Sequence, residues 1–448
     1  MKKLAVIAAL VSTPLAAQDG DPAAAVSEAR LRADVEAMVA FGTRHTLSEQ
    51  DNPKRGIGAA VDWGLAEMRR IGAACGGCLT VVAPERMVSG DRIPVPVRLR
   101  NAVAIQRGTE RPDEVVIVQA HIDSRASDVL DWKSDAPGAN DDASGSALVL
   151  EAARQLSRRP YPVTIVYALL SGEEQGLFGG RLLADYAAEQ GWQVKAVLNN
   201  DIVGNSCGSD GTCDSETVRV FSEGPRADLT PELRAAQRRD GGENDTPSRN
   251  LSRFIARLAA GVPQGLDVRQ VWRADRMGRG GDQLPFLDKG YPAIRFSVAV
   301  EDYDHQHQDL RSENGVRYGD TADEMDFAYL ARVTRLNIQM LDTLARSPAP
   351  PRARARAAVQ TFTDLSWDAV PGAASYSVWQ RRTDAPYWPD APVRAGVAAV
   401  SLRLDGVRGD DWIFGVSACT ADGLCSPVAS AVPAGQFAPN PAAQGDSR

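Results

Sequence analysis

The sequence predicts an α/β fold, in which a mixed, largely parallel sheet is flanked by helices, followed by a small C-terminal all-β sandwich. Two observations lead to this prediction. Between about residues 103 and 341, apolar runs of strand length alternate with helical patterns, which is typical of a parallel or mixed sheet covered on both faces. After a proline-rich stretch, the chain changes to short runs of alternating polar and apolar residues separated by turn residues, which is typical of a sandwich.

Four runs in the first part have the length and composition of buried strands. Val115–Val118 is wholly β-branched, and an acidic turn after it leads into a helical pattern. Three more such strands and one more helix follow before a long closing helix. The expected strands are 115–118, 163–170, 196–199 and 293–298, and the expected helices are 147–156, 177–188 and 325–344.

One long segment interrupts this alternation. Gly204–Asn250 is rich in Gly, Asp, Arg and Glu, and we expect a long loop with one short helix near Pro231–Arg239. Loops of this length are usually functional or disordered. The segment is therefore predicted to form one wall of the functional cleft.

The C-terminal part resembles a fibronectin type III domain over about residues 350–435, although another sandwich topology remains open. Leu365-Ser366-Trp367-Asp368 resembles the second strand with its core tryptophan, and Trp412–Ala418 resembles the sixth strand. The expected organisation is a signal peptide at 1–17, an α/β domain at 18–346, a proline-rich linker at 347–352, a sandwich at 353–435 and a disordered tail at 436–448.

The N-terminus and the cysteines predict export. Lys2-Lys3 precedes an apolar stretch too short to span a bilayer, and Ala16-Ala17 offers a small-residue cleavage point. Six cysteines form three close pairs, which in an exported chain indicates local disulfides. The CxxC spacing of Cys75 and Cys78 leaves a redox motif or half of a zinc clip as an alternative. We expect a periplasmic or secreted protein with no membrane anchor.

Composition narrows the possible partners. The 448 residues carry a formal net charge of -8, with 44% hydrophobic and 24% charged residues. An acidic chain of ordinary globular composition does not indicate nucleic-acid binding. Composition gives no indication of the oligomeric state.

The few histidines are the most informative residues of the chain. There are four, and three stand beside carboxylates: His121 in His121-Ile122-Asp123, and His305 and His307 in Asp304-His305-Gln306-His307-Gln308-Asp309. Imidazole and carboxylate are the ligands that bind zinc when no thiolate is offered. Further acids follow other strands, and we expect no basic residue among them. A site for two metal ions is therefore predicted from His121, Asp141, Glu173, Glu174, Asp201 and one C-terminal histidine.

Each of these motifs has an ordinary structural alternative. A Glu-Glu pair is usually a solvated face, and a lone aspartate after a strand, such as Asp201, is often a helix cap. Asp123 shares a face of an extended segment with His121 and can orient the imidazole from behind. Asp282 is either an acidic residue of the site or the cap of a helix through Pro285–Leu287.

The motifs together resemble the co-catalytic zinc aminopeptidases, over roughly residues 100–345. The segments that carry the resemblance are His121-Ile122-Asp123-Ser124, the turn at 136–145, Ser171-Gly172-Glu173-Glu174 and Asn200-Asp201. That family includes the bacterial leucyl aminopeptidase and is related to glutamate carboxypeptidases and glutaminyl cyclases. The resemblance implies two zinc ions and peptide substrates with a free N-terminus. It implies Asp141 as the bridging ligand, His121 and Asp201 at one zinc, Glu174 and a histidine at the other, Asp123 behind His121, and Glu173 as general base.

The C-terminal histidine is the point where the sequence departs from the family pattern. His305 stands four residues before Asp309, the spacing that the family shows, so His305 is preferred and His307 is the alternative. Two other functional classes remain open. One is a carboxypeptidase or a single-zinc glutaminyl cyclase on the same scaffold, and the other is a non-catalytic binding protein.

Overall fold

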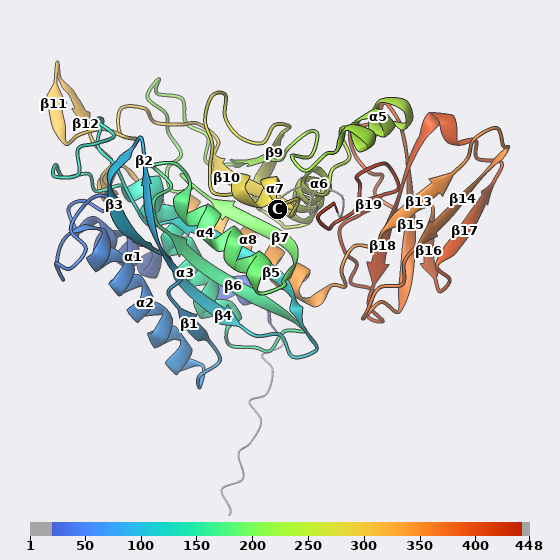
Figure 1. The fold of residues 1–448 in the computed structure, drawn as a ribbon, viewed down its shortest axis with the longest axis horizontal. Coiled ribbons are helices and arrows are strands. Elements are labelled where there is room, and N and C mark those ends of the chain that lie inside the picture. Colours follow the sequence, from blue (N-terminus) through green and yellow to red (C-terminus); the bar gives the residue numbers. More distant parts are fainter. Residues whose placement is uncertain (1–19, 441–448) are drawn as a thin grey trace, which may run out of the picture.

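A computed structural model describes residues 20–440, so the predicted signal peptide lies outside the described residues. Its main element is an eight-stranded sheet with the order β1-β4-β6-β5-β7-β10-β8-β9 (Figure 1). The strands of this sheet are β1 (Thr80–Val82), β4 (Ala102–Gln106), β5 (Arg111–His121), β6 (Val163–Leu170), β7 (Gln193–Asn200), β8 (Thr217–Phe221), β9 (Asp267–Val271) and β10 (Ala293–Val298).

The centre of the sheet is parallel, as predicted. Strand β5 pairs with β6 and with β7, and β7 pairs with β10, all in parallel. The flanking pairs β1–β4, β4–β6 and β8–β10 are antiparallel. Strand β6 is buried along its whole length, because its residues pack into the hydrophobic cores on both faces of the sheet. This topology brings the carboxyl ends of β5, β6, β7 and β10 to one edge.

Helices cover both faces of the sheet. Helices α1, α2, α3, α6 and α8 contribute to the larger hydrophobic core on one face, and α4 and α7 contribute to the smaller core on the other. The helices are α1 (Glu28–Val39), α2 (Gly56–Ala74), α3 (Ser144–Leu156), α4 (Phe178–Glu189), α5 (Pro231–Asp240), α6 (Pro247–Ala260), α7 (Leu284–Asp288) and α8 (Phe327–Arg346).

One sequence expectation needs correction. The predicted loop Gly204–Asn250 contains β8 and the first residues of α6 as well as the expected α5. Strand β8 has only five residues, with Arg219 in the middle, so its sequence lacks the continuous apolar run of the central strands. Its pairing with β10 stabilises it as a strand. Short hairpins β2–β3 (Glu85–Gly90, Ile93–Arg100) and β11–β12 (Arg311–Glu313, Val316–Tyr318) complete this part.

The C-terminal part contains two antiparallel sheets, with strand orders β13-β14-β17 and β16-β15-β18-β19. Trp367, Val378, Phe414 and Val416 form the core of this sandwich. Its resemblance to a fibronectin type III domain stays a prediction. The strands are β13 (Ala353–Arg356), β14 (Phe362–Trp367), β15 (Ser375–Arg382), β16 (Arg394–Val397), β17 (Ser401–Asp405), β18 (Trp412–Cys419) and β19 (Ala429–Ser430).

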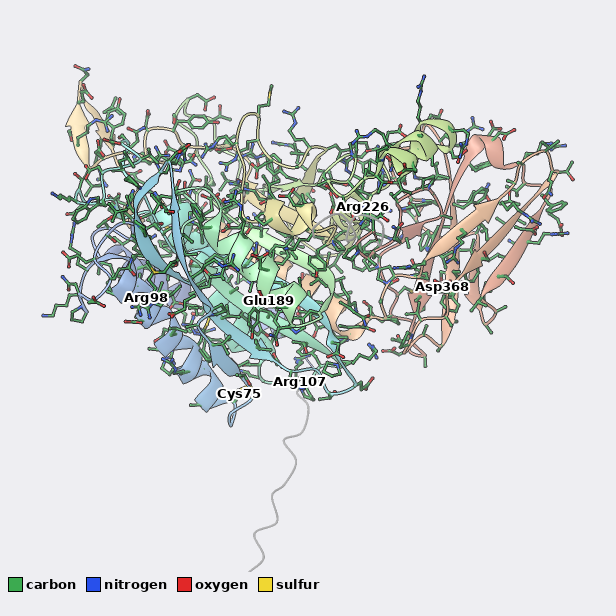
Figure 2. All side chains as sticks on the ribbon, in the orientation of Figure 1. Cys75, Arg98, Arg107, Glu189, Arg226 and Asp368 are labelled. Atoms are coloured by element: carbon green, nitrogen blue, oxygen red, sulfur yellow. A yellow bond between two sulfur atoms is a disulfide. The ribbon has the colours of Figure 1, made fainter. Side chains whose placement is uncertain are left out.

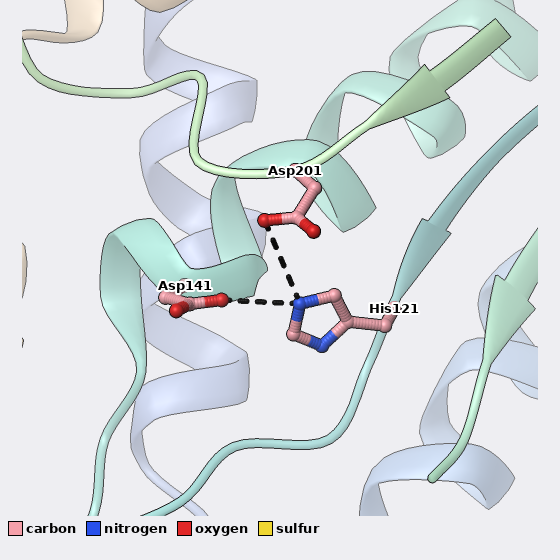
Figure 3. Close-up of side chains that lie close together, drawn as sticks. All are labelled: His121, Asp141 and Asp201. Carbon is pink, nitrogen blue, oxygen red and sulfur yellow. Dashed lines mark ion pairs between the residues drawn. The ribbon is translucent and has the colours of Figure 1, made fainter. Parts of the chain in front are cut away.

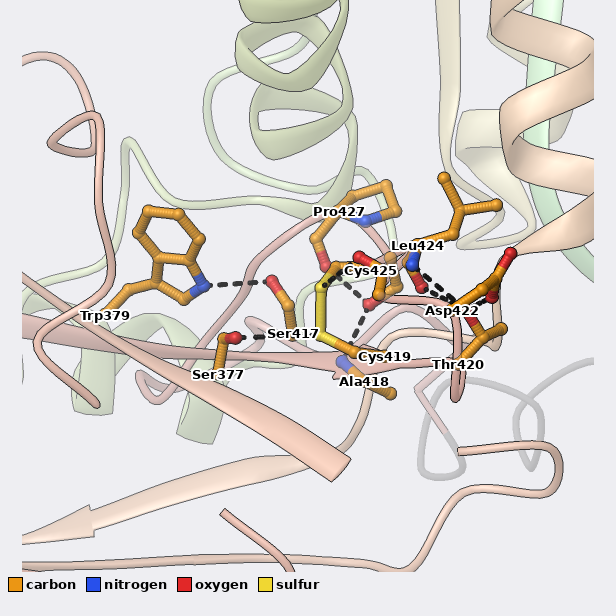
Figure 4. Close-up of a disulfide and its surroundings, with 12 residues drawn as sticks. Ser377, Trp379, Ser417, Ala418, Cys419, Thr420, Asp422, Leu424, Cys425 and Pro427 are labelled. Atoms are coloured by element: carbon orange, nitrogen blue, oxygen red, sulfur yellow. Dashed lines mark hydrogen bonds between the residues drawn. A yellow bond between two sulfur atoms is a disulfide. The ribbon is translucent and has the colours of Figure 1, made fainter. Parts of the chain in front are cut away.

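The cysteines form the three local disulfides that their spacing predicts: Cys75–Cys78, Cys207–Cys213 and Cys419–Cys425. Cys75 and Cys78 therefore do not offer a thiolate pair to a metal. The third bridge closes the turn after β18, close to Trp379, whose indole N–H donates to Ser417 Oγ at 3.0 Å (Figure 4).

Residues 436–440 do not belong to a disordered tail, contrary to the sequence expectation. Arg226, buried between the two parts of the molecule (Figure 2), donates to the carbonyl oxygens of Gln436 and Ala438, at 2.8 Å each. The Asn440 backbone N–H donates to Asp228 Oδ2 at 2.8 Å. A buried guanidinium needs several acceptors, and this segment supplies them.

The sandwich is joined to the α/β part by a buried polar network. Arg381 of β15 donates to both carboxylate oxygens of Asp245, at 2.6 and 2.7 Å. Asp245 Oδ1 also accepts from Ser430 Oγ at 3.0 Å, and Arg253 lies 3.4 Å away. The Trp388 indole N–H donates to Asn250 Oδ1 at 3.0 Å. The two parts are thus fixed to each other by directional bonds.

A membrane-crossing segment is not found in this fold. Within residues 20–440, none of the helices combines the length and the apolar character that a bilayer span requires.

The network makes a prediction about stability. Asp245→Asn leaves the buried Arg381 guanidinium without its counter-charge, and we expect a loss of about 3 kcal/mol in the free energy of unfolding. The matched control is Asp364→Asn, which removes the more exposed pair with Arg403 inside the sandwich and should cost less than about 1 kcal/mol. Urea denaturation followed by tryptophan fluorescence measures both. Equal losses would mean that the network contributes no more than an exposed ion pair.

Candidate metal centre

The predicted site residues converge at the carboxyl edge of the parallel strands. His121 is the last residue of β5, and Asp201 directly follows β7. Glu173 and Glu174 follow β6, and the segment with His307 follows β10. Ligand sites of open α/β sheets lie outside this edge, because the loops that leave adjacent parallel strands meet there.

The first donor group consists of His121, Asp141 and Asp201 (Figure 3). The Nε2 atom of His121 lies 3.1 Å from Asp141 Oδ1 and 3.9 Å from Asp201 Oδ1. All three side chains are buried. The closer contact does not have hydrogen-bond geometry, so Nε2 is a buried nitrogen without a hydrogen-bond partner among the described residues. The three donor atoms lie within 4.8 Å of one another.

The second donor group consists of Asp141, Glu174 and His307. The Nε2 atom of His307 lies 2.9 Å from Asp141 Oδ2 and 3.0 Å from Glu174 Oε1. Asp141 therefore turns one oxygen toward each group. Within each group, the donor atoms all lie within 4.8 Å of one another.

This donor set fits zinc. Neutral imidazole nitrogens and carboxylate oxygens are the zinc ligands of catalytic sites. Glu174 Oε1, like His121 Nε2, is buried without a hydrogen-bond partner among residues 20–440. Buried polar atoms that lack a partner are costly, and two of them facing other donors are the pattern expected around a bound cation.

The structure favours the alternative histidine. His305 Nδ1 lies 2.6 Å from Asp302 Oδ2, and its Nε2 lies 3.8 Å from Glu324, away from both donor groups. His307 has a backbone φ of +56°, in the left-handed region that non-glycine residues rarely adopt. The chain thus turns at His307 in a way that the spacing to Asp309 does not reveal.

The electrostatics of the site favour a cation. Burial alone would lower the pKa of His121, but Asp123 and Asp141 outweigh it and hold this pKa well above its usual value. Burial is similarly outweighed at His307, where Glu174 and Asp141 raise the pKa to about 9. Burial raises the pKa of Glu173 well above its usual range. Carboxylates therefore dominate the site, which is the condition that attracts a metal ion.

Asp123 lies behind His121, but its strongest contacts differ from the expectation. The Nδ1 atom of His121 is closer to the Asp123 carbonyl oxygen, at 3.1 Å, than to its carboxylate, at 3.5 Å. The Asp123 carboxylate accepts from the backbone N–H groups of Glu173 and Glu174, at 3.2 Å each. Asp123 therefore orients both the imidazole and the acidic pair.

Glu173 has a free carboxylate. Its side chain is half-buried and makes no hydrogen bond or ion pair within 4.0 Å to another described residue. The side chain of its neighbour Glu174 belongs to the second donor group and contacts His307. The pair thus has one carboxylate that faces the donors and one that is available to a substrate or to water.

Asp282 is not a helix cap. Its Oδ1 accepts from the Gly180 backbone N–H at 3.1 Å, and α7 has no side-chain cap. The side chain is fully buried, which raises its pKa to about 7, and its Oδ2 has no hydrogen-bond partner among the described residues. Asp282 thus belongs to the acidic surroundings of the site.

Sequence reasoning missed two carboxylates that hold the turn carrying Asp141. Asp142 accepts from the backbone N–H groups of His121 and Gly145, at 3.2 and 2.9 Å. Asp320 accepts from the backbone N–H of Asp141 at 2.7 Å. The peptide bond between Asp141 and Asp142 is cis. The acidic doublet 141–142 was a visible signal for Asp142. Nothing in the sequence distinguishes Asp320.

The expectation of a site without basic residues is wrong. Arg295 in the middle of β10 is fully buried, and its Nη2 lies 2.8 Å from Asp201 Oδ1. An arginine inside the mostly apolar run 293–298 was the available signal, because a buried guanidinium requires a buried acid.

Comparisons with known proteins agree with this geometry. The model of peptidase family M28 matches residues 101–336. A probable zinc metalloprotease of Leptosphaeria maculans is 43% identical over 90% of this chain and 94% of its own length, and one of Pyricularia oryzae is 43% identical over 93% and 85%. The crystal structure of LapB from Legionella pneumophila has a similar fold, with a TM-score of 0.51, 18% identity and coverage of 73% of this chain and 74% of that one. With its family model and its relatives in agreement, the chain belongs to peptidase family M28.

Proposed function

We propose that this protein is an exported, dizinc aminopeptidase, which removes N-terminal residues from peptides. One observation carries the proposal: two donor groups meet at Asp141, which turns one carboxylate oxygen toward each. In this assignment His121 and Asp201 hold one zinc, and Glu174 and His307 hold the other. Each ion then has a histidine and two carboxylates, of which one is shared.

Zinc at both positions would polarise the scissile carbonyl and lower the pKa of a water molecule. Glu173 is the general base, because its carboxylate is free and adjacent to the ligand Glu174. Its role is to accept the proton of the attacking water and to pass it to the leaving amine. Asp123 holds the backbone of Glu173 and so keeps this carboxylate in place.

The surplus of acids supports recognition of a substrate amine. Asp282 and Glu173 stand beside the donor groups, and neither forms an ion pair with a basic side chain among residues 20–440. Three arginines near the site are already engaged: Arg44 with backbone carbonyl oxygens, Arg276 with Glu301, and Arg295 with Asp201. A substrate carboxylate finds no free guanidinium among them, which disfavours a carboxypeptidase.

Export is supported by the three disulfides. Disulfides persist in oxidising compartments and are rare in the cytosol. Each bridge closes a loop of the described fold. The periplasm and the extracellular medium both satisfy this condition.

The first test is the reaction itself. The purified chain is expected to hydrolyse aminoacyl-p-nitroanilides, to lose this activity with a chelator and to regain it with zinc. N-blocked peptides with a free C-terminus and peptides with N-terminal glutamine are supplied in parallel. Release of C-terminal residues would indicate a carboxypeptidase, and cyclisation with one zinc per chain would indicate a glutaminyl cyclase.

A second prediction concerns the general base. Glu173→Gln keeps the shape of the side chain but cannot accept a proton, so kcat should fall by about 100-fold or more while two zinc ions remain bound. Zinc content by elemental analysis is measured on the same samples as kcat. Near-native turnover with both ions bound would show that the proton acceptor is another group.

A third prediction separates the two histidines. His307→Ala removes a donor that lies 3.0 Å from Glu174, and we expect the loss of one zinc per chain and of nearly all activity. His305→Ala is the matched control, because it changes the same residue type in the same segment. It should keep both ions. If His305→Ala loses zinc and His307→Ala does not, the ligand is His305, as the sequence analysis preferred.

A further inference from the structure

Arg295 poses an electrostatic problem for the proposed metal centre. Among residues 20–440 it is the one arginine or lysine within 4.0 Å of a carboxylate of either donor group, and it contacts Asp201 at 2.8 Å. A cation held by Asp201 would lie close to a buried guanidinium, which repels it and competes with it for the same oxygens.

Asp275 supplies the missing counter-charge. Its two carboxylate oxygens lie 3.1 and 3.0 Å from Arg295 Nη1, whereas Asp201 is contacted by Nη2. The guanidinium is thus shared between a carboxylate of the metal centre and one outside it. Gly280 adds its carbonyl oxygen to Nη1 at 2.9 Å.

Asp275 is itself held rigidly and in its charged form. It is 5% exposed, and Gln283 Nε2 donates to it at 2.7 Å. Burial would raise its pKa, but Arg295 and Arg276 outweigh burial and hold this pKa at about 2. Arg276 contacts Asp275 at 3.2 Å and also Glu301 at 3.0 Å. Asp275 is therefore shared between Arg276 and Arg295 and is not the sole counter-charge of Arg276.

We propose that Asp275 is a positioning residue for the metal centre: by sharing Arg295 with Asp201, it leaves Asp201 free to bind a cation. This inference rests on the proposed dizinc function. Without the Asp275 charge, Arg295 has Asp201 as its remaining carboxylate partner and a net positive charge beside the ion. Both effects weaken the zinc held by His121, Asp141 and Asp201. The zinc held by Glu174 and His307 is not in contact with Arg295 and keeps its affinity.

The test uses the full chain, freed of metal and titrated with zinc against a competing chelator. Asp275→Asn should weaken one of the two zinc-binding steps by about 10-fold to 100-fold, the usual effect of changing a residue behind a metal ligand. The other step should stay within about twofold. The kcat of the variant should approach that of the wild type at saturating zinc. Asp275→Glu keeps the charge and should recover most of the affinity.

Two controls separate positioning from a loss of stability. Asp34→Asn breaks another buried aspartate–arginine pair, with Arg154 in the last turn of α3, and should lower stability without changing either zinc step. In an Arg295→Gln background, Asp275→Asn should have little further effect on zinc, because the two residues act through one contact. If Arg295→Gln does not fold, the comparison of Asp275→Asn with Asp34→Asn decides.

The outcomes distinguish this inference from the proposed function. Unchanged zinc steps in Asp275→Asn, or a loss equal to that of Asp34→Asn, would overturn the role of Asp275 while two ions still bind to the wild type. A wild-type chain that does not take up two zinc ions would refute the dizinc function itself.

Discussion

Buried negative charge at one edge of a parallel sheet is the constraint on which the rest of the structure depends. Asp123, Asp141, Asp142, Glu174 and Asp201 are all at most 5% exposed, and they lie on loops that leave neighbouring strands. Carboxylates buried at this density are stable only with backbone N–H donors, cationic side chains or a metal ion. The fold supplies the first two, and the two donor groups at Asp141 supply a place for the third.

These acids have different structural roles, which follow from the groups that each of them contacts. Asp123 and Asp142 accept backbone N–H groups and so shape the turns, and each of them holds a segment that carries a donor. Asp201 and Glu174 instead direct oxygens toward histidines. Ile202, next to Asp201, has a φ of +58°, which is unusual for a β-branched residue. An unfavourable backbone conformation of this kind is typical of functional sites, where the surrounding structure holds a side chain in a required position.

The sequence predicted the central strands and most of the candidate ligands, because both have local signals. A wholly apolar run such as Val115–Val118 marks a buried strand, and an acid or imidazole directly after it marks the functional edge. The remainder depends on tertiary contacts. A charged residue such as Arg295 is unexpected in a buried strand. Its ion pairs with Asp201 and Asp275 explain it, and they are visible only in the structure. The preference for His307 rests on its contacts with Asp141 and Glu174, which the spacing of residues does not reveal.

Helix α6 has a consequence for how the molecule unfolds. It packs against β9 of the main sheet and against β19 of the sandwich, and Figure 1 shows it between the two. On its first turn, Asn250 bonds to Ser430 and to Trp388, both in the sandwich. The apolar face of α6, with Leu251, Ile255 and Ala259, belongs to the core of the α/β part, while its first turn is hydrogen-bonded to the sandwich. Unfolding of the sandwich would break the buried hydrogen bonds that α6 makes with it, so we expect the two parts to unfold as one cooperative unit.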